Sequence, residues 1–120
     1  MRQLRFLCDE DVSHDIIMFL RSIEPAIDVL VSGEAGAPPK QASDGIVYRA
    51  AVTLGRTLLS GDKRTMSRVF TADLLAGGHN SGVIFLKSGH SGASYTAMIH
   101  LIWFCETTDD WIDRIDYIPY

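Results

Sequence analysis

The sequence predicts an α/β fold of three layers, in which a mostly parallel five-stranded sheet carries helices on both faces. Two features of the pattern lead to this prediction. Short apolar runs, often β-branched, alternate along the chain with longer stretches whose apolar residues recur at helical spacing. Such alternation is typical of parallel strands joined by right-handed crossover helices. A chain of 120 residues, 47% of them hydrophobic, suits one core, so we expect a single domain over residues 1–120.

The first part of the chain predicts a strand, a helix and a second strand. Residues 4–8 form an apolar run that ends at charged residues, which is typical of a buried strand. A helix is expected over 12–23, where the apolar positions are Ile16, Phe19, Leu20 and Ile23. Residues 27–31 are rich in β-branched side chains and predict the second strand, and the glycines and prolines of 32–41 predict a loop after it.

The middle of the chain predicts a helix, a short strand and a further helix. Ser43 is a favourable N-cap, and Gly55 marks the end of a helix whose expected apolar face consists of Ile46, Val47, Ala50, Ala51 and Leu54. Residues 57–60 predict the third strand. The next helix is stopped by Gly77-Gly78, and its apolar residues are Met66, Val69, Phe70, Leu74 and Leu75.

The last third of the chain predicts two more strands on either side of a long apolar helix. Residues 82–86 predict the fourth strand, and a glycine-rich loop over 88–92 leads into a helix over 93–105. A helical turn over 109–111 precedes the fifth strand, 114–118, whose alternating character suits an edge of the sheet.

Composition restricts the partners and the location of the protein. The formal net charge is -4, which argues against broad electrostatic adhesion to nucleic acid but allows a local basic patch. No apolar run reaches the roughly 18 residues of a membrane span, and the amino-terminal residues lead into a predicted strand rather than a targeting signal. We therefore expect a cytoplasmic protein without a membrane partner. Cys8 and Cys105 form no metal or redox motif, and both are expected to be buried.

Acidic residues stand where the predicted strands end. Asp9, Glu10 and Asp11 follow the first strand directly, Asp62 follows the third, and Asp44 lies in the first turn of the second helix. Because the carboxyl ends of parallel strands share one edge of the sheet, acids from three βα units are expected to meet there. Their oxygens are the ligands that Mg²⁺ or Mn²⁺ prefers. Such an ion orients and deprotonates a water for attack on a phosphodiester.

Each acid also has a purely structural explanation. Asp44 suits the amino end of a helix, and Asp62 is a good N-cap for the helix that follows it. Glu10 and Asp11 are explained equally well as solvated residues. Spacing alone leaves the metal pocket and these local roles open.

Several segments of the chain together resemble a known family. They are residues 6–13 (FLCDEDVS), 42–44 (ASD), 57–66 (TLLSGDKRTM) and 72–83 (ADLLAGGHNSGV), with the surroundings of Trp103 and Trp111. Their order and spacing resemble the PIN-like proteins catalogued as a domain of unknown function, which are compact relatives of the PIN-domain toxins of bacterial toxin-antitoxin pairs. The resemblance covers essentially the whole chain.

The resemblance implies a PIN-type sheet with a metal-dependent endoribonuclease site at its carboxyl edge. Asp9, Asp44 and Asp62 match the first, second and third catalytic acids of the family, which hold the metal. Asp11 replaces the usual asparagine and adds a charge and a further ligand, and Glu10 is an auxiliary ligand. Arg64 stands where many members carry Asp or Asn, and a cation there either competes with the metal or binds the RNA phosphate. The resemblance implies RNA and an antitoxin protein as partners, and an exposed set of aromatic residues would indicate an interface with an antitoxin or with a second copy of the chain.

Basic and aromatic residues leave two explanations open. Lys63, Arg64 and Arg68 are either phosphate contacts for single-stranded RNA or an exposed helical face. The loop over 88–92 lacks both the Walker lysine and the GxGxxG pattern, so no nucleotide cofactor is predicted. The aromatic residues that belong either to the core or to a partner surface are Trp103, Trp111, Phe104, Tyr117 and Tyr120.

Two other functions fit the same residues. The acids after the first strand, Asp62 after the third and Ser88 after the fourth also resemble a phospho-receiver domain, although the lysine expected after its fifth strand is missing. The other function is that of a catalytically inactive PIN-like module that binds a protein partner, because Arg64 departs from the family pattern.

Overall fold

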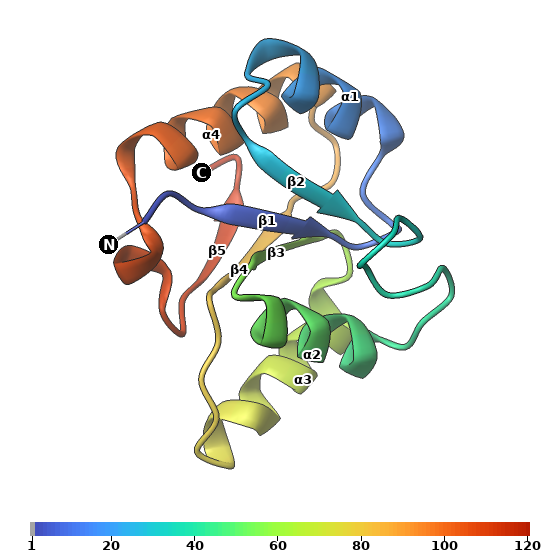
Figure 1. Ribbon diagram of the computed structural model, residues 1–120, viewed down its shortest axis with the longest axis vertical. Coiled ribbons are helices and arrows are strands. Elements are labelled where there is room, and N and C mark those ends of the chain that lie inside the picture. Colours follow the sequence, from blue (N-terminus) through green and yellow to red (C-terminus); the bar gives the residue numbers. More distant parts are fainter. Residues whose placement is uncertain (1) are drawn as a thin grey trace.

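Five parallel strands form one sheet in the order β2-β1-β3-β4-β5 in the computed structural model, which describes residues 2–120 (Figure 1). The strands are β1 (Arg5–Cys8), β2 (Asp28–Val31), β3 (Thr57–Ser60), β4 (Val83–Leu86) and β5 (Ile115–Ile118). Every pairing between neighbours is parallel. The predicted α/β class is therefore confirmed, and the sheet is wholly rather than mostly parallel. β5 lies at an edge, as its alternating pattern predicted.

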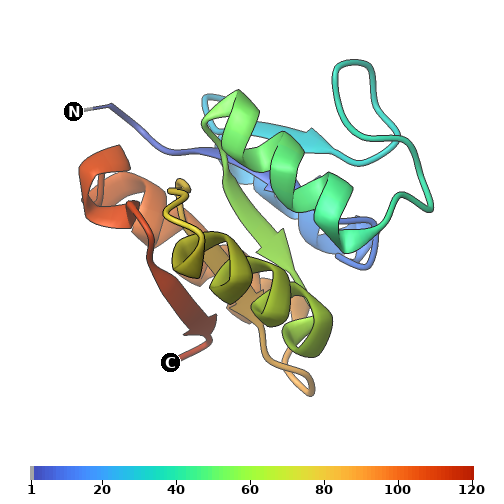
Figure 2. The same cartoon turned by 90° about the horizontal axis from the view of Figure 1, so that it is seen from below.

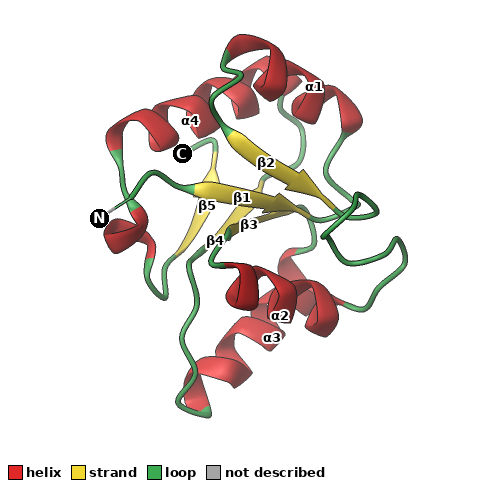
Figure 3. Cartoon of the chain, in the orientation of Figure 1, coloured by secondary structure: helices red, strands yellow, loops and turns green. Residues whose placement is uncertain are grey.

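Two pairs of helices cover the two faces of the sheet. The helices are α1 (His14–Ile23), α2 (Asp44–Leu54), α3 (Lys63–Leu75) and α4 (Gly92–Cys105), and a short 3-10 helix, η1 (Thr108–Trp111), precedes β5. α1 packs beside α4 on one face, and α2 packs beside α3 on the other, as Figure 2 and Figure 3 show. The predicted three-layer arrangement is confirmed. No helix among residues 2–120 is both long and apolar enough to cross a membrane.

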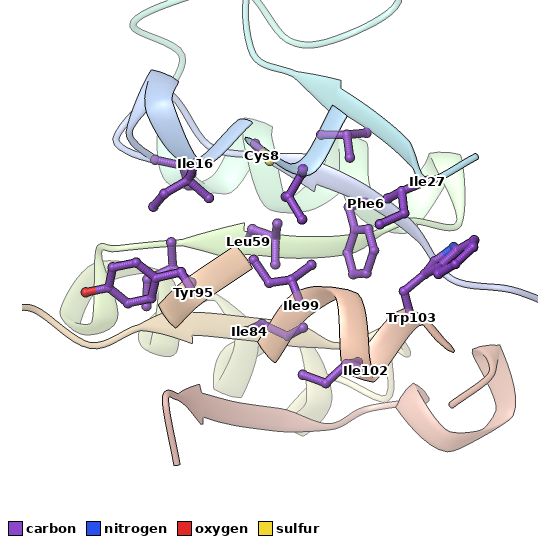
Figure 4. Close-up of a cluster of buried hydrophobic side chains, with 14 of the residues drawn as sticks. Phe6, Cys8, Ile16, Ile27, Leu59, Ile84, Tyr95, Ile99, Ile102 and Trp103 are labelled. Carbon is purple, nitrogen blue, oxygen red and sulfur yellow. The ribbon is translucent and has the colours of Figure 1, made fainter. Parts of the chain in front are cut away.

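Alternation along β1 divides its apolar side chains between two cores. Phe6 and Cys8 join the core beneath α1 and α4, whereas Leu7 joins the core beneath α2 and α3. This division follows from the two-residue period of a strand. Figure 4 shows the first core, in which Ile16 of α1 and Ile99 of α4 meet side chains of the sheet.

Local signals set the helix ends close to where the sequence predicted them. Ser43 Oγ accepts a hydrogen bond from the amide of Ile46 at 3.3 Å, and α2 begins at the residue after this N-cap. α2 ends at Gly55, whose φ of 65° is the left-handed conformation that glycine adopts readily. α1 begins at His14, two residues later than predicted, because Ser13 is its N-cap.

Two predictions about burial are wrong. Ile46 is 56% exposed, and Tyr48 instead contributes to the buried face of α2. Cys105 is exposed, whereas Cys8 is buried as expected. The two misjudged residues lie in the first or last turn of a helix, where helical periodicity does not tell how far the neighbouring layer extends.

The aromatic residues are divided between the core and the surface. Trp103 and Trp111 are buried, so both serve packing. Phe104, Tyr117 and Tyr120 are exposed and remain accessible to a partner.

Candidate active site

The carboxyl ends of β1 and β3 lie next to each other in the interior of the sheet. The two strands pair from Phe6 with Thr57 to Cys8 with Leu59, and the amide of Asp9 donates to the carbonyl of Leu59 at 2.9 Å. After these strands the chain diverges, because α1 lies on one face of the sheet and α3 on the other (Figure 1). Open α/β sheets bind their ligands where the connections diverge in this way.

Asp9 is the most deeply buried acid of this edge, with 6% of its surface exposed. Its Oδ1 accepts a hydrogen bond from the amide of Glu10 at 2.9 Å, and its Oδ2 accepts one from Ser60 Oγ at 3.3 Å. Burial, followed by the charge of Asp11 and to a lesser degree that of Asp44, raises the pKa of Asp9 to about 6. Such shifts are common where a side chain has a chemical task.

Asp11 lies at the mouth of the same site. Its two carboxylate oxygens each accept from the amide of Gly61 at 3.2 Å. A Cβ atom on residue 61 would meet Asp11 Oδ2 at 3.2 Å, so glycine permits this close approach. Although Asp11 is accessible, neighbouring groups shield its carboxylate from water, and this shielding, together with the charge of Asp62, raises its pKa.

Asp44 and Asp62 bring two further carboxylates to this edge. Asp44 is the first residue of α2, and its pKa is raised by partial burial and by the nearby carboxylate of Asp62. Asp62 is the N-cap of α3, where its Oδ1 accepts from the amide of Thr65 at 3.2 Å. The amide of Asp62 donates to Ser60 Oγ at 3.1 Å. The predicted N-cap role of Asp62 is therefore confirmed. Asp62 also lies near the other acids, because its charge affects the pKa of Asp44 and Asp11.

Together, Asp9, Asp11, Asp44 and Asp62 form what we call the acid cluster. It collects carboxylates from three βα units that are far apart in the sequence. None of the four forms an ion pair within residues 2–120. Charges within the cluster contribute to raising the pKa of Asp9, Asp11 and Asp44.

Glu10 has a different position from the four aspartates. Its Oε1 accepts a hydrogen bond from the amide of Gln41 at 2.6 Å, which ties it to the loop between β2 and α2. Gln41 has a φ of 65°, a left-handed conformation that is uncommon outside glycine. Glu10 thus holds this loop beside the site.

The donors of the acid cluster suit a hard divalent cation, because they are carboxylate oxygens without a counter-charge. The positions of these carboxylates fit a cation less well than their chemistry does. Among residues 2–120, no three His, Cys, Asp or Glu side chains are grouped so that they could hold a metal ion. Asp44 and Asp62 form one close pair, while Asp9 and Asp11 interact through their charges. The donor chemistry fits Mg²⁺ or Mn²⁺, and side-chain rotation would be needed to bring three carboxylates to one ion.

The predicted basic group is divided between the site and a more distant surface. Lys63 and Arg64 open α3 directly after Asp62, and Arg64 is exposed. Within residues 2–120 neither of them forms an ion pair with the acid cluster. Arg68 lines a separate hollow on the surface of α3, together with Leu75.

Two residues of this site were missed by sequence reasoning. Ser60, fully buried at the end of β3, donates to Asp9 and accepts from the amide of Asp62. Lys87 follows β4 and lines a pocket of about 320 Å³ that Asp11 also lines. The available signals were a hydroxyl at the end of an apolar strand and a lysine directly after another strand.

Comparison of the chain with family models, with curated proteins and with solved structures gives no match. The resemblance to PIN-like proteins therefore stays a prediction.

Proposed function

We propose that the protein is a Mg²⁺- or Mn²⁺-dependent endoribonuclease that hydrolyses phosphodiesters of single-stranded RNA. The observation that carries the proposal is the acid cluster, whose four carboxylates have no ion-pair partner within residues 2–120. Like charges gathered in this way destabilise the protein, which is typical of a functional rather than a structural site. The resemblance of the chain to PIN-like proteins supports the same activity.

The roles of the acids follow from their positions. Asp9, Asp44 and Asp62 would hold the ion, and Asp11 would assist from the mouth of the site. The bound ion would supply an activated water and would neutralise charge on the leaving oxygen. Ser60 orients the Asp9 carboxylate through its hydroxyl, at 3.3 Å from Asp9 Oδ2.

The substrate side of the proposal concerns the basic residues of α3. Lys63 and Arg64 would contact RNA phosphates beside the acid cluster. Arg68, which lies one turn further along α3, would contact the same RNA. Local contacts of this kind are needed because a protein with a formal net charge of -4 repels nucleic acid overall. A cytoplasmic location, where RNA is found, belongs to the same proposal.

Cleavage of an end-labelled single-stranded RNA tests the activity directly. Mn²⁺ should support cleavage, a chelator should stop it, and Asp9→Asn should slow it by about a hundredfold or more. The matched control is Asp109→Asn, the same change at an exposed aspartate of η1, which should cleave like the natural protein. Equal rates in the natural protein and in Asp9→Asn would contradict the assignment.

Metal binding is tested separately from cleavage. Titration with Mn²⁺ should broaden the amide signals near Asp9 and Asp62, and Asp9→Asn should lose this response. Spectra that do not change when Mn²⁺ is added would rule out the nuclease proposal. A clear response to Mn²⁺ without cleavage of a broad panel of RNAs would instead support an inactive module that binds a protein partner.

A protein partner, either an antitoxin or a second copy of the chain, is part of the proposal. α4 contains no Asp, Glu, Lys or Arg. The apolar side chains that α1 and α4 leave exposed are Met18, Phe19, Ile23, Leu101 and Phe104. A helix that is apolar on all sides is normally covered on all sides. Light scattering of the purified protein tests the second copy, because a mass of two chains supports self-association and a mass of one chain rejects it.

A phospho-receiver is the second candidate, because the strand order β2-β1-β3-β4-β5 is also the order of that signalling fold. Asp62, which follows β3, would accept the phosphoryl group. Incubation with a small phosphodonor and Mg²⁺ should then add the mass of one phosphoryl group, and Asp62→Asn should prevent the addition. An unchanged mass would favour the nuclease.

A further inference from the structure

The pocket of about 320 Å³ beside the acid cluster has walls of opposite charge. Asp11 contributes to it from the end of β1, and Lys87 contributes from the end of β4, with β3 between these two strands in the sheet. Among the described residues that line this pocket, Lys87 is the one lysine or arginine. We call this space the Asp11–Lys87 pocket.

Lys87 has a fixed backbone and an ammonium group without an acidic partner. Its amide donates to the carbonyl of Ile118 at 2.8 Å, and its carbonyl accepts from the hydroxyl of Tyr95, so β5 and α4 both hold it. Its side chain makes no ion pair anywhere within residues 2–120. A lysine in this state is free to bind an anion without first breaking a salt bridge.

Hydroxyl groups add hydrogen-bond donors to the same pocket. Ser13 lines it, and Ser13 Oγ accepts from the amide of Asp15 at 3.3 Å, which leaves the hydroxyl hydrogen able to donate. Ser88, which is exposed, also lines the pocket. A group that accepts hydrogen bonds and carries one negative charge is complementary to these donors together with Lys87.

We propose that the Asp11–Lys87 pocket holds a phosphodiester of the RNA backbone, and that Lys87 is its principal positive contact. This inference rests on the proposed nuclease function and assigns the substrate contact beside the acid cluster. A phosphodiester placed here would have carboxylates and their cation on the Asp11 side and the ammonium group on the Lys87 side. Lys63 and Arg64 do not line this pocket, so they would contact flanking phosphates.

A two-nucleotide RNA with a single phosphodiester is the probe that tests the pocket. Its binding to the full chain is followed through the amide signals of Gly61 and Ser88, with Ca²⁺ as a cation that takes oxygen ligands. Lys87→Met removes the charge, Lys87→Arg keeps it, and Lys40→Met is the matched control at an exposed lysine that does not line the pocket. Circular dichroism establishes that each variant is folded.

The natural protein should bind the dinucleotide and shift both signals. Lys87→Met should weaken binding by about tenfold or more, because it removes a hydrogen bond to a charged group. Lys87→Arg and Lys40→Met should stay within about threefold of the natural protein. Undiminished binding by Lys87→Met, or no shift of the two signals in the natural protein, would overturn the proposal.

Two experimental outcomes distinguish the pocket proposal from the nuclease proposal. Dinucleotide binding that depends on Lys87, without any cleavage or Mn²⁺ response, would keep the phosphate pocket and reject the nuclease. Mn²⁺-dependent cleavage of RNA that is unaffected by Lys87→Met, in both affinity and rate, would keep the nuclease and reject the pocket.

Discussion

Ser60 Oγ donates a hydrogen bond to Asp9 Oδ2 across 3.3 Å, and both residues are buried where β3 and β1 end side by side. The same hydroxyl oxygen accepts from the amide of Asp62 at 3.1 Å. One serine therefore connects two members of the acid cluster that are far apart in sequence.

Asp9→Asn should stabilise the protein when no metal is present. Burial raises the pKa of Asp9 from its usual 3.8 to about 6, so ionised Asp9 destabilises the fold at neutral pH by up to about 3 kcal/mol. In a chelator at pH 7.5, urea unfolding should therefore give Asp9→Asn the larger free energy of unfolding. Asp109→Asn, changed at an exposed position, should show no such gain. A loss of stability in Asp9→Asn under these conditions would contradict the burial of an uncompensated charge.

The pH dependence of that difference has a definite sign. The pKa of Asp9 is higher in the folded than in the unfolded chain. Between pH 3.8 and about pH 6, the folded chain therefore binds more protons than the unfolded chain. The stability contributed by protonated Asp9 is present below pH 3.8 and is lost as the pH rises through about 6. The gain from Asp9→Asn should thus fall toward zero near pH 4, measured by urea unfolding at several pH values. A gain that is independent of pH would point to another cause.

Ser60→Ala should raise the pKa of Asp9 above its present value. The serine hydrogen bond favours the ionised carboxylate, so its loss favours the protonated form. Removal of the hydroxyl also leaves the amide of Asp62 without its acceptor, and the free energy of unfolding should fall by about 1 to 3 kcal/mol. Carbon NMR of the Asp9 carboxyl during a pH titration measures the first effect. Ser22→Ala, at an exposed position of α1, is the control and should leave the pKa of Asp9 unchanged. An unchanged pKa of Asp9 in Ser60→Ala would reject the role of Ser60.

Asp62→Asn and Asp62→Ala should separate capping from metal binding. Asn is a good N-cap, so Asp62→Asn keeps an acceptor for the amide of Thr65, whereas Asp62→Ala removes it and should cost about 1 kcal/mol. Both variants lose a carboxylate, and both should weaken Mn²⁺ binding by about tenfold or more. Thermal unfolding with and without Mn²⁺ reports both effects. If Asp62→Asn binds Mn²⁺ like the natural protein, Asp62 is a cap alone.

Tyr48→Phe should destabilise the fold and leave metal binding unchanged. The buried Tyr48 hydroxyl donates to Asp73 Oδ2 at 2.7 Å and accepts from Asn80 Nδ2 at 3.1 Å. Its removal leaves polar groups without partners, so we expect a loss of about 1 to 3 kcal/mol in urea unfolding. Tyr120→Phe removes a hydrogen bond to Asp116 at an exposed position and should cost less. A changed Mn²⁺ response in Tyr48→Phe would show that this network extends to the acid cluster.

Local sequence was sufficient for the elements and their ends. Ser43 and Gly55 marked the limits of α2 because capping depends on the residue itself and on its nearest neighbours. The acids after β1 and β3 were also identified in advance, because the carboxyl end of a parallel strand can be located from the apolar run that precedes it.

Tertiary structure decided which of those local features meet. The order β2-β1-β3-β4-β5 makes β1 and β3 neighbours, which gives Ser60 its place beside Asp9. The pairing of β3 with β4 then brings Lys87 to the pocket that Asp11 lines. Tertiary structure also decided which side chains of α2 are buried. The apolar pattern predicted a buried Ile46, but Ile46 is exposed and Tyr48 is buried. Helix caps and apolar runs are local properties, whereas strand order and layer coverage arise from packing between distant segments, which a single sequence does not specify residue by residue.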